Sequence, residues 1–409
     1  MVAVNVAMPD PIWKVPFDWE ARQPWLDLPF PMDEYAGRIA RLRAKMAERQ
    51  LDCLFVYAGL PDLGSVMYLC NFQSRAGHTL LVLPIAADPV LVTTSVLHGE
   101  PMHTGIQNTW VRDIVPGLNA YNVREPRNIA DMAVDAVRER QIRTERPGLV
   151  GHATLPGPIA RRLEERLGRA PAAATDLVRD LRKIKGPREL ALMRKAGEIT
   201  DRAIEAGLAA ARPGMTESEL AAKIAEAAYA GGAERMAVLW VAAGPRSALK
   251  NVPPKPIPMQ PGDLVNMDVG VVWGGYLTDC HRTLVLGEPT RRQRAMLEAC
   301  LEASLRTSEV LRPGLPIVEA QLAMRQVAEQ AGLLDIYFSE IGFGHGGGLA
   351  ITEEPSLYWG NPEPFEAGMT FFLEPMFIDH AVGTVCIEDV VAITASGCEF
   401  LTNVRRRTW

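Results

Sequence analysis

The segment LVNMDVGVVWGGYLTDCHRTLVL, residues 264–286, places two carboxylates inside apolar runs. Asp268 and Asp279 lie eleven residues apart, and each belongs to a run that is typical of a β-strand. Three glycines lie between them (Gly270, Gly274 and Gly275) and favour a hairpin. Antiparallel pairing brings the two carboxylates together, and facing carboxylates repel each other unless a cation neutralises them. The segment therefore predicts a hairpin built around a divalent metal ion.

A second acidic pair repeats this arrangement near the end of the chain. Glu374 and Glu388 lie fourteen residues apart in the strand-like runs FFLEPMF and VCIEDVV, and His345 lies in the glycine-rich string FGHGGGL. Four carboxylates and one imidazole suit Mn²⁺, Fe²⁺, Co²⁺ or Zn²⁺ and disfavour a structural zinc site of thiolates. Two such ions about 4 Å apart can bridge a hydroxide nucleophile and polarise a carbonyl. Each residue taken alone is more often a surface charge, a turn cap or a loop residue, so the hypothesis depends on the combination.

The composition is typical of a globular protein with two domains. The chain has 409 residues, of which 48% are hydrophobic and 22% are charged, and this length exceeds that of one ordinary core. A formal net charge of −6 argues against a large nucleic-acid interface. We interpret the short basic run Arg405–Arg407 as a solvated tail.

The distribution of cysteine and apolar residues bears on cellular location. The six cysteines form no C-x-x-C pair and are interpreted as free thiols in a reducing compartment. The N-terminal residues lack the charged and apolar regions of a signal peptide. The longest apolar stretch, residues 78–97, contains two prolines and is typical of two strands around a turn. We therefore expect a cytoplasmic protein without a membrane span.

The first part of the chain divides into an arm and a domain. Residues 1–32 are rich in Pro and Trp and are expected to form an N-terminal arm packed on its own domain, with a dimer-spanning or site-capping arm as the alternatives. Residues 33–180 predict an α/β domain. Its expected helices cover residues 33–50, 127–140 and 157–167, and its expected strands are Cys53–Tyr57, Val66–Leu69, Thr79–Leu83 and Val90–Thr94.

Residues 183–409 predict an α+β domain. Pro187 is typical of a helix start, and Thr216 with Glu219 forms the capping box of a second helix. Strand patterns follow after Ala237, helical patterns return at 290–311 and 316–331, and the strings MTFFLEPMFI and VCIEDVVAIT close the chain as strands.

The acidic motifs also occur in a familiar order. The strings NMDVG, GGYLTDCHRT, GHGGGL, LEP and IEDVV, with the helix opening IKGPRELALMRKA, resemble the motifs of the creatinase/prolidase/aminopeptidase P superfamily over roughly residues 33–400. The resemblance implies a pita-bread catalytic domain behind a smaller N-terminal domain, usually in a homodimer, with two divalent metal ions. It implies that Asp279 and Glu388 bridge the ions, that Asp268 chelates one of them, and that His345 and Glu374 hold the other. Glu374 is also the implied proton shuttle.

Departures from the family pattern concern substrate contacts. The peptidases carry a histidine in a segment like SGPNAALPH and another seven residues after the histidine ligand, and this chain has Asn251 and Thr352 there. By resemblance, those histidines bind substrate and stabilise the reacting carbonyl. Asn and Thr donate hydrogen bonds but supply no proton near neutral pH. His281, where the family usually has Thr, and His380 are candidate catalytic replacements, with a supporting or surface role as the alternative for each.

Three functions remain open at this point. The leading hypothesis is a dinuclear metal-dependent hydrolase of a C–N amide bond, similar to an Xaa-Pro peptidase but with a divergent short-peptide or small-molecule substrate. The alternative is a non-peptidase enzyme on the same scaffold, either a small-molecule amide or amidine hydrolase or a lyase of the dimethylsulfoniopropionate type. The third is a catalytically inactive binding module, which the complete set of acidic and imidazole ligands disfavours.

Overall fold

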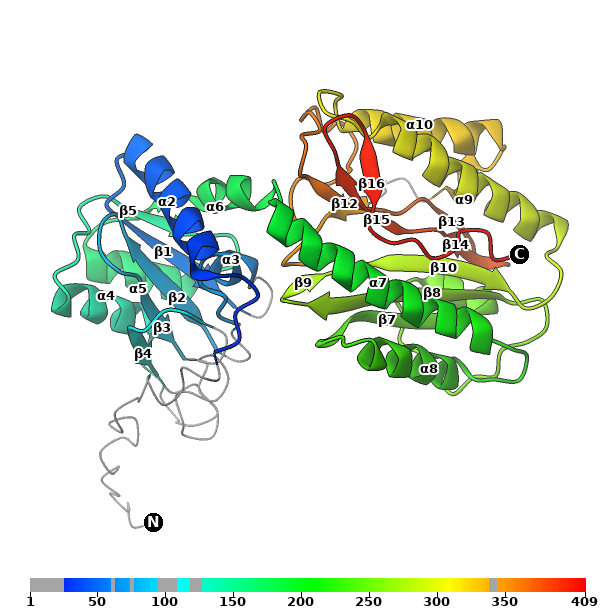
Figure 1. Cartoon of the computed structure of the whole chain (residues 1–409), viewed down its shortest axis with the longest axis horizontal. Coiled ribbons are helices and arrows are strands. Elements are labelled where there is room, and N and C mark those ends of the chain that lie inside the picture. Colours follow the sequence, from blue (N-terminus) through cyan, green and yellow to red (C-terminus); the bar gives the residue numbers. More distant parts are fainter. Residues whose placement is uncertain (1–25, 60–62, 74–76, 95–108, 118–126, 338–343) are drawn as a thin grey trace, which may run out of the picture. The chain divides into compact units, whose positions relative to one another are not determined.

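The computed structural model describes residues 26–59, 63–73, 77–94, 109–117, 127–337 and 344–409. The chain forms two compact units, Met1–Arg182 and Lys183–Trp409 (Figure 1). Of the expected N-terminal arm, residues 1–25 lie outside the described residues. No helix in the described ranges is long and apolar enough to span a membrane.

The first unit is built on a mixed six-stranded sheet with the order β4-β3-β2-β1-β5-β6. The central strand β1 pairs antiparallel with β2 and parallel with β5. Every residue of β1, β2, β3 and β5 is buried, so the α/β prediction for this unit is confirmed. The strands are β1 (Cys53–Ala58), β2 (Thr79–Pro84), β3 (Val90–Thr93), β4 (Ile114–Pro116), β5 (Pro147–Val150) and β6 (Ala172–Ala173), and the helices are α2 (Met32–Glu48), α3 (Gly64–Cys70), α4 (Ile129–Glu139), α5 (Gly157–Leu167) and α6 (Thr175–Arg182).

One expected strand of this unit is a helix instead. The run Val66–Leu69 lies inside α3, whose seven residues are all buried. A short apolar run that is buried on every side has no alternation to show whether it is a helix or a strand. The helix ends at Asn71, which has a left-handed backbone with φ +58°, a conformation that Asn tolerates better than most residues.

The second unit begins with two helices packed on an antiparallel sheet. Figure 1 shows α7 and α8 in green beside β7 and β8, and β8 lies between β7 and β10 in the sheet. The predicted capping box is confirmed, because the Glu219 amide donates to Thr216 Oγ1 at 3.2 Å and the Thr216 amide donates to Glu219 Oε2 at 2.8 Å. The elements are α7 (Pro187–Ala210), α8 (Glu217–Ala230), β7 (Arg235–Ala243), a 3₁₀ turn η4 (Gly244–Leu249), β8 (Leu264–Trp273), β9 (Tyr276–Leu277) and β10 (Cys280–Val285).

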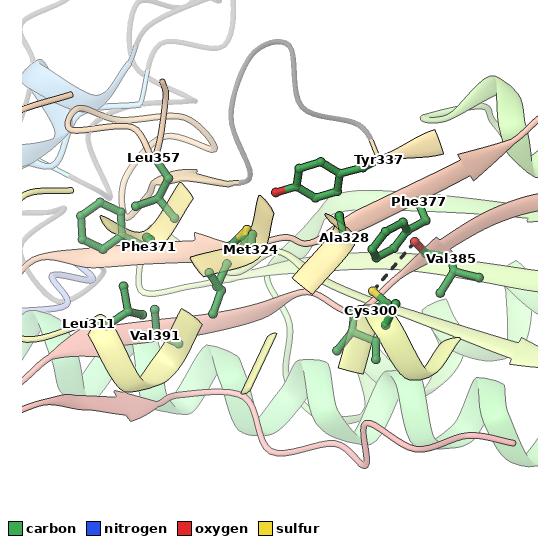
Figure 2. Packing of buried hydrophobic residues seen from close by; sticks show 14 of the residues in the cluster. Cys300, Leu311, Met324, Ala328, Tyr337, Leu357, Phe371, Phe377, Val385 and Val391 are labelled. Carbon is green, nitrogen blue, oxygen red and sulfur yellow. Dashed lines mark hydrogen bonds between the residues drawn. The ribbon is translucent and has the colours of Figure 1, made fainter. Parts of the chain in front are cut away.

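The second half of this unit repeats the plan with its own core. Figure 2 shows Cys300 of α9 and Met324 and Ala328 of α10 among the aromatic side chains Phe371 and Phe377 of the strands. Two helices thus cover antiparallel strands in each half, which is the α+β architecture expected. The elements are α9 (Arg291–Val310), α10 (Val318–Gln330), a 3₁₀ turn η5 (Leu334–Ile336), β11 (Gly344–Gly346), β12 (Thr370–Leu373), β13 (Met376–Asp379), β14 (Gly383–Cys386), β15 (Asp389–Ile393) and β16 (Cys398–Phe400).

The last two predicted strands are each divided in two, and each division falls at a glutamate. MTFFLEPMFI breaks between β12 and β13 at Glu374–Pro375, and VCIEDVVAIT breaks between β14 and β15 at Ile387–Glu388. Pro375 has no amide hydrogen to continue the ladder. As a result β12 pairs with β15 in a four-stranded sheet, whereas β13 pairs only with β14. Both glutamates therefore lie where the strands change from one sheet to the other.

A buried arginine joins the two halves beside this break. Arg282 on β10 is fully buried and forms an ion pair with Asp389 at 2.6 Å. Its guanidinium also donates to the carbonyl oxygens of Glu388 and Val404, at 2.6 and 2.9 Å. These bonds satisfy the charge of Arg282 and fix the backbone next to Glu388.

Candidate metal centre

Three side chains lie in one row across the β7, β8 and β10 strands of the second unit. In the strand register, Asp268 on β8 pairs with Trp240 on β7 and with His281 on β10. Residues directly opposite each other on antiparallel strands project from the same face of the sheet. The Asp268 carboxylate therefore lies between an indole and an imidazole. Asp268 and His281 are both buried.

The predicted hairpin brings Asp279 to Asp268. The turn after β8 contains Gly274 and Gly275 with φ +57° and +78°, angles that residues with a Cβ rarely adopt. Asp279 follows β9 and is buried. One carboxylate oxygen of Asp268 and one of Asp279, the Oδ1 atom in each case, have no hydrogen-bond partner among the described residues.

The glycines around His345 are required by close contacts. A Cβ atom on Gly344, which has φ +116°, would lie 2.0 Å from the carbonyl oxygen of Phe372, and a Cβ on Gly347 would lie 2.3 Å from the Phe372 ring. His345 Nδ1 lies 3.2 Å from the carbonyl oxygen of Gly346. Because a carbonyl oxygen only accepts, the proton is assigned to Nδ1, and the lone pair is on Nε2.

Glu388 is shared by two groups of possible ligand atoms. It is 1% exposed, and neither of its carboxylate oxygens has a hydrogen-bond partner in the described part of the chain. One ligand atom each from Asp279, His345 and Glu388 lie within 4.8 Å of one another, and the same holds for Asp268, His281 and Glu388. Four of the five predicted ligands thus lie together, with Asp268, Asp279 and His345 placed around the Glu388 carboxylate.

The fifth predicted ligand, Glu374, has a different partner. Its Oε1 atom lies 3.2 Å from Nζ of Lys250. Burial alone would lower the pKa of Lys250. Electrostatic interactions with Glu374, Cys386 and Glu388 together outweigh this effect, so the pKa is raised and the ammonium form is favoured. Lys250 is a site residue that the sequence interpretation missed. The available signal was its position beside Asn251, in the segment already compared with the peptidase histidine.

The electrostatics of the cluster favour a bound cation. Burial raises the pKa of Asp268 to about 7 and also raises the pKa values of Asp279 and Glu388 well above those of ordinary carboxyls. Burial lowers the pKa of His281 to about 3 and lowers that of His345 as well. Buried carboxylates with unpaired oxygens next to neutral imidazoles are costly alone and form a suitable donor set for a divalent metal.

A cavity of about 540 Å³ opens over these groups. Asp268, Asp279, His345 and Glu374 line it, together with Trp240, Lys250, Asn251, Thr352, Ser356 and Met376. Asn251 and Thr352, the two positions expected to contact substrate, are both exposed at this cavity. Its volume is in the range of small-ligand sites.

The structure does not bring His380 to this cavity. His380 is exposed in the turn between β13 and β14, four residues beyond Met376, the nearest lining residue along the chain. A strand advances about 3.3 Å per residue, so the hairpin carries His380 away from the carboxylates. Of the two candidate replacement histidines, only His281 lies at the ligand cluster.

Comparisons with known proteins find matches for both units of the chain. Residues 38–184 match the creatinase/prolidase N-terminal domain, and residues 191–395 match metallopeptidase family M24. The probable dipeptidase PepE of Mycobacterium tuberculosis is 30% identical over 382 residues, covering 91% of this chain and 96% of that protein.

Two further relatives extend the comparison. An Xaa-Pro dipeptidase of Pyrococcus furiosus is 35% identical over 232 residues, covering 56% of this chain and 66% of that protein, just under two thirds of its length. The crystal structure of dipeptidase PepE from Mycobacterium ulcerans superposes with a TM-score of 0.77 at 28% identity, covering 92% of this chain and 98% of that one. The fold, the order of the acidic motifs and these matches agree, and the chain belongs to metallopeptidase family M24, with a creatinase/prolidase N-terminal domain and a pita-bread catalytic domain.

Proposed function

We propose that this protein is a dinuclear metal-dependent hydrolase of a C–N amide bond, similar to the peptidases of its family. The observation that carries the proposal is the group of buried carboxylates with unpaired oxygens, Asp268, Asp279 and Glu388, at a cavity large enough for a small substrate. The chemistry that two divalent ions supply in such a site is polarisation of a carbonyl and activation of water.

The proposed roles of the ligands rest on their positions and on the family resemblance. Glu388 belongs to both groups of ligand atoms and would contact both ions. The family resemblance implies the same role for Asp279. Asp268 would hold one ion, and the family resemblance implies that His345 and Glu374 would hold the other. Glu374, half-buried and at the cavity wall, is also the proposed proton shuttle between attacking water and leaving amine.

The substrate is proposed to differ from a standard Xaa-Pro dipeptide. Among the described residues that line the larger cavity, His345 is the only histidine, and Asn251 and Thr352 occupy the positions where the resembled peptidases carry an imidazole. Loss of one donor to a developing oxyanion typically lowers the rate by about 10² to 10³. Trp240 and Met376 supply apolar contact area, and Lys250 adds a cation. These residues favour a short peptide or another small amide whose charges are arranged differently from those of an Xaa-Pro dipeptide.

A metal-reconstituted substrate screen tests both parts of the proposal. Xaa-Pro dipeptides, longer Xaa-Pro peptides and small amides are incubated with protein loaded with Mn²⁺, Co²⁺, Fe²⁺ or Zn²⁺. We expect metal-dependent hydrolysis of a non-standard amide and weak turnover of Xaa-Pro dipeptides. The double variant Asn251→His with Thr352→His is expected to hydrolyse those dipeptides faster than the wild type.

Two results would count against the proposal in distinguishable ways. Wild-type turnover of Xaa-Pro dipeptides at about 10 s⁻¹ or more, a normal enzymatic rate, would contradict the proposal of a divergent substrate. The proposal of a hydrolase would then still stand. Amide hydrolysis that persists unchanged in metal-free protein would remove the metal-dependent mechanism. The homodimer implied by the family resemblance stays a prediction, which light scattering of the purified protein tests.

A further inference from the structure

We infer that His281 is a metal ligand in this protein, binding through Nδ1 the ion that Asp268 holds. The inference rests on the proposed dinuclear centre and adds a ligand to it. It assigns to each ion one imidazole, His345 on one side and His281 on the other, with Glu388 shared between them. The family pattern used above has Thr at this position, so the ligand would be specific to chains that carry His here.

The position of His281 follows from the strand register. His281 pairs directly with Asp268 across β8 and β10, and its backbone exchanges hydrogen bonds with that of Glu388. Its Nδ1 atom lies 3.8 Å from Asp268 Oδ2, which is too long for a hydrogen bond. Two donors that bind the same ion at about 2.0 to 2.2 Å each can be up to about 4 Å apart. The observed separation therefore fits an ion between the two atoms.

A hydrogen-bond chain determines which nitrogen of His281 carries the proton. Asn266 Nδ2 donates to the carbonyl oxygen of Thr384 at 2.8 Å, which fixes the orientation of the amide. The Oδ1 atom of Asn266 then faces His281 Nε2 at 2.7 Å. Because this oxygen only accepts, Nε2 carries the proton and the lone pair of the neutral ring is on Nδ1. Metal-binding histidines usually donate their other ring N–H to an oxygen in this way.

The lone pair on Nδ1 has nothing else to bind in the described structure. Nδ1 is buried and has no hydrogen-bond partner among the described residues. A separate small cavity of about 20 Å³ is lined by Asn266, Asp268 and His281, among others. A cavity of this size admits one ion or one water molecule. A lone pair and a carboxylate directed at the same small space repel each other, and a cation between them turns this repulsion into attraction.

The chemistry of the added ligand affects metal preference. Imidazole suits Zn²⁺ and Fe²⁺, whereas an all-oxygen site suits Mn²⁺ and Mg²⁺. We therefore expect the site between Asp268 and His281 to prefer Zn²⁺ or Fe²⁺ over Mn²⁺ more strongly in the wild type than in a His281→Thr variant.

The direct test is nuclear magnetic resonance of wild-type protein labelled with ¹⁵N-histidine, titrated with Zn²⁺. The His281 Nδ1 resonance is assigned by its loss in His281→Ala. We expect its chemical shift to change at the same ratio of Zn²⁺ to protein at which the site fills. His345 Nε2 should change as well, and the exposed His152 of the first unit should not. A change at His345 without a change at His281 would overturn this inference and leave the proposed metal centre intact. Unchanged resonances at both would instead contradict the metal centre itself.

Binding measurements on variants supply an independent readout. Equilibrium dialysis with Co²⁺ should show that His281→Ala and His281→Thr weaken the binding of one ion at least about tenfold, the lower end of what loss of a supporting group alone costs, while His152→Ala binds as the wild type does. The absorption spectrum of the Co²⁺ protein should change in the His281 variants because a nitrogen donor is lost. Two ions bound with wild-type affinity and spectrum in His281→Thr would also overturn the inference.

Discussion

His281 and Glu388 exchange backbone hydrogen bonds: the Glu388 amide donates to the His281 carbonyl at 2.9 Å, and the His281 amide donates to the Glu388 carbonyl at 3.3 Å. His281 comes from the first half of the second unit and Glu388 from the other half. The ligand cluster therefore exists only when both halves are folded against each other. Metal binding should accordingly be coupled to the folding of this unit.

Removal of a bridging carboxylate should abolish the metal response. In Asp279→Asn or Glu388→Gln we expect no metal-dependent hydrolysis and no rise in melting temperature on metal addition, whereas the wild type gains about 2.7 kcal/mol at a metal concentration 100-fold above its Kd. The metal-free variants should melt no lower than the metal-free wild type, since a neutral amide replaces a buried acid. Differential scanning calorimetry measures both effects.

The matched control for these variants is Glu226→Gln, which alters an exposed ion pair with Lys223 on α8. A solvent-exposed pair of this kind contributes little to stability, so this variant should keep the metal response. Retained activity in Asp279→Asn or Glu388→Gln would show that the bridging ligands are assigned incorrectly.

The stability that the protein gains from metal binding should increase with pH. Burial raises the pKa of Asp268 from an ordinary 3.8 to about 7, so the folded metal-free protein holds a proton that the unfolded chain releases. The contribution of Asp268 to the stability of the metal-free protein should therefore fall as the pH rises from about 4 to about 7. The pKa of His281, lowered by burial from 6.5 to about 3, gives a contribution of opposite sign that rises up to about pH 6.5. Metal binding requires the carboxylate form, so metal affinity should rise over the same window.

Melting temperatures measured from pH 5 to pH 7.5 with and without Zn²⁺ test this expectation. The gap between the two series should widen with pH. A gap that is constant or narrows would mean that the ligand carboxyls are already ionised in the metal-free fold.

The sequence predicted the parts of the site that depend on local pattern. The hairpin between Asp268 and Asp279 follows from two apolar runs and a glycine pair, and the structure has it. The divided strands at Glu374 and Glu388 were not predicted, because the apolar pattern continues across both breaks and only the pairing partners change. The ion pair of Lys250 with Glu374 links residues far apart in the sequence, and no local spacing encodes such a contact. The strand expected at Val66–Leu69 was wrong because burial on every side removes the periodicity.

Lys250 should compete with a metal ion for Glu374. Its ammonium lies 3.2 Å from the carboxylate, and a hydrogen bond to a charged group is worth about 1.5 to 3 kcal/mol. Lys250→Met should therefore tighten binding of the ion beside Glu374 by roughly tenfold or more, as measured by isothermal titration calorimetry with Mn²⁺. Lys195→Met, on a more exposed lysine that pairs with Glu198, should leave the affinity unchanged. Weaker binding in Lys250→Met would show that the lysine supports the site instead of competing with the ion.

Arg282 should be essential to the stability of the second unit. Arg282→Met leaves Asp389, which is fully buried, with Arg406 as its remaining ion-pair partner. Breaking a buried pair typically costs about 3 to 5 kcal/mol, and urea unfolding should show a loss of that order. Arg194→Met removes a more exposed pair with Glu399 and should cost at most about 1 kcal/mol. Equal losses in the two variants would contradict the proposed role of Arg282.

The metal content of the reconstituted protein tests the central claim most directly. Purified protein is stripped of metal, dialysed against Mn²⁺, Co²⁺ or Zn²⁺, freed of excess ion and analysed by inductively coupled plasma mass spectrometry beside the Glu388→Gln variant. The proposed dinuclear centre should hold about two ions per wild-type chain, because one ion would leave part of the carboxylate cluster uncompensated, and the variant should hold fewer. Wild-type protein that retains no ion under any of these conditions and still hydrolyses its substrate would contradict the proposed centre.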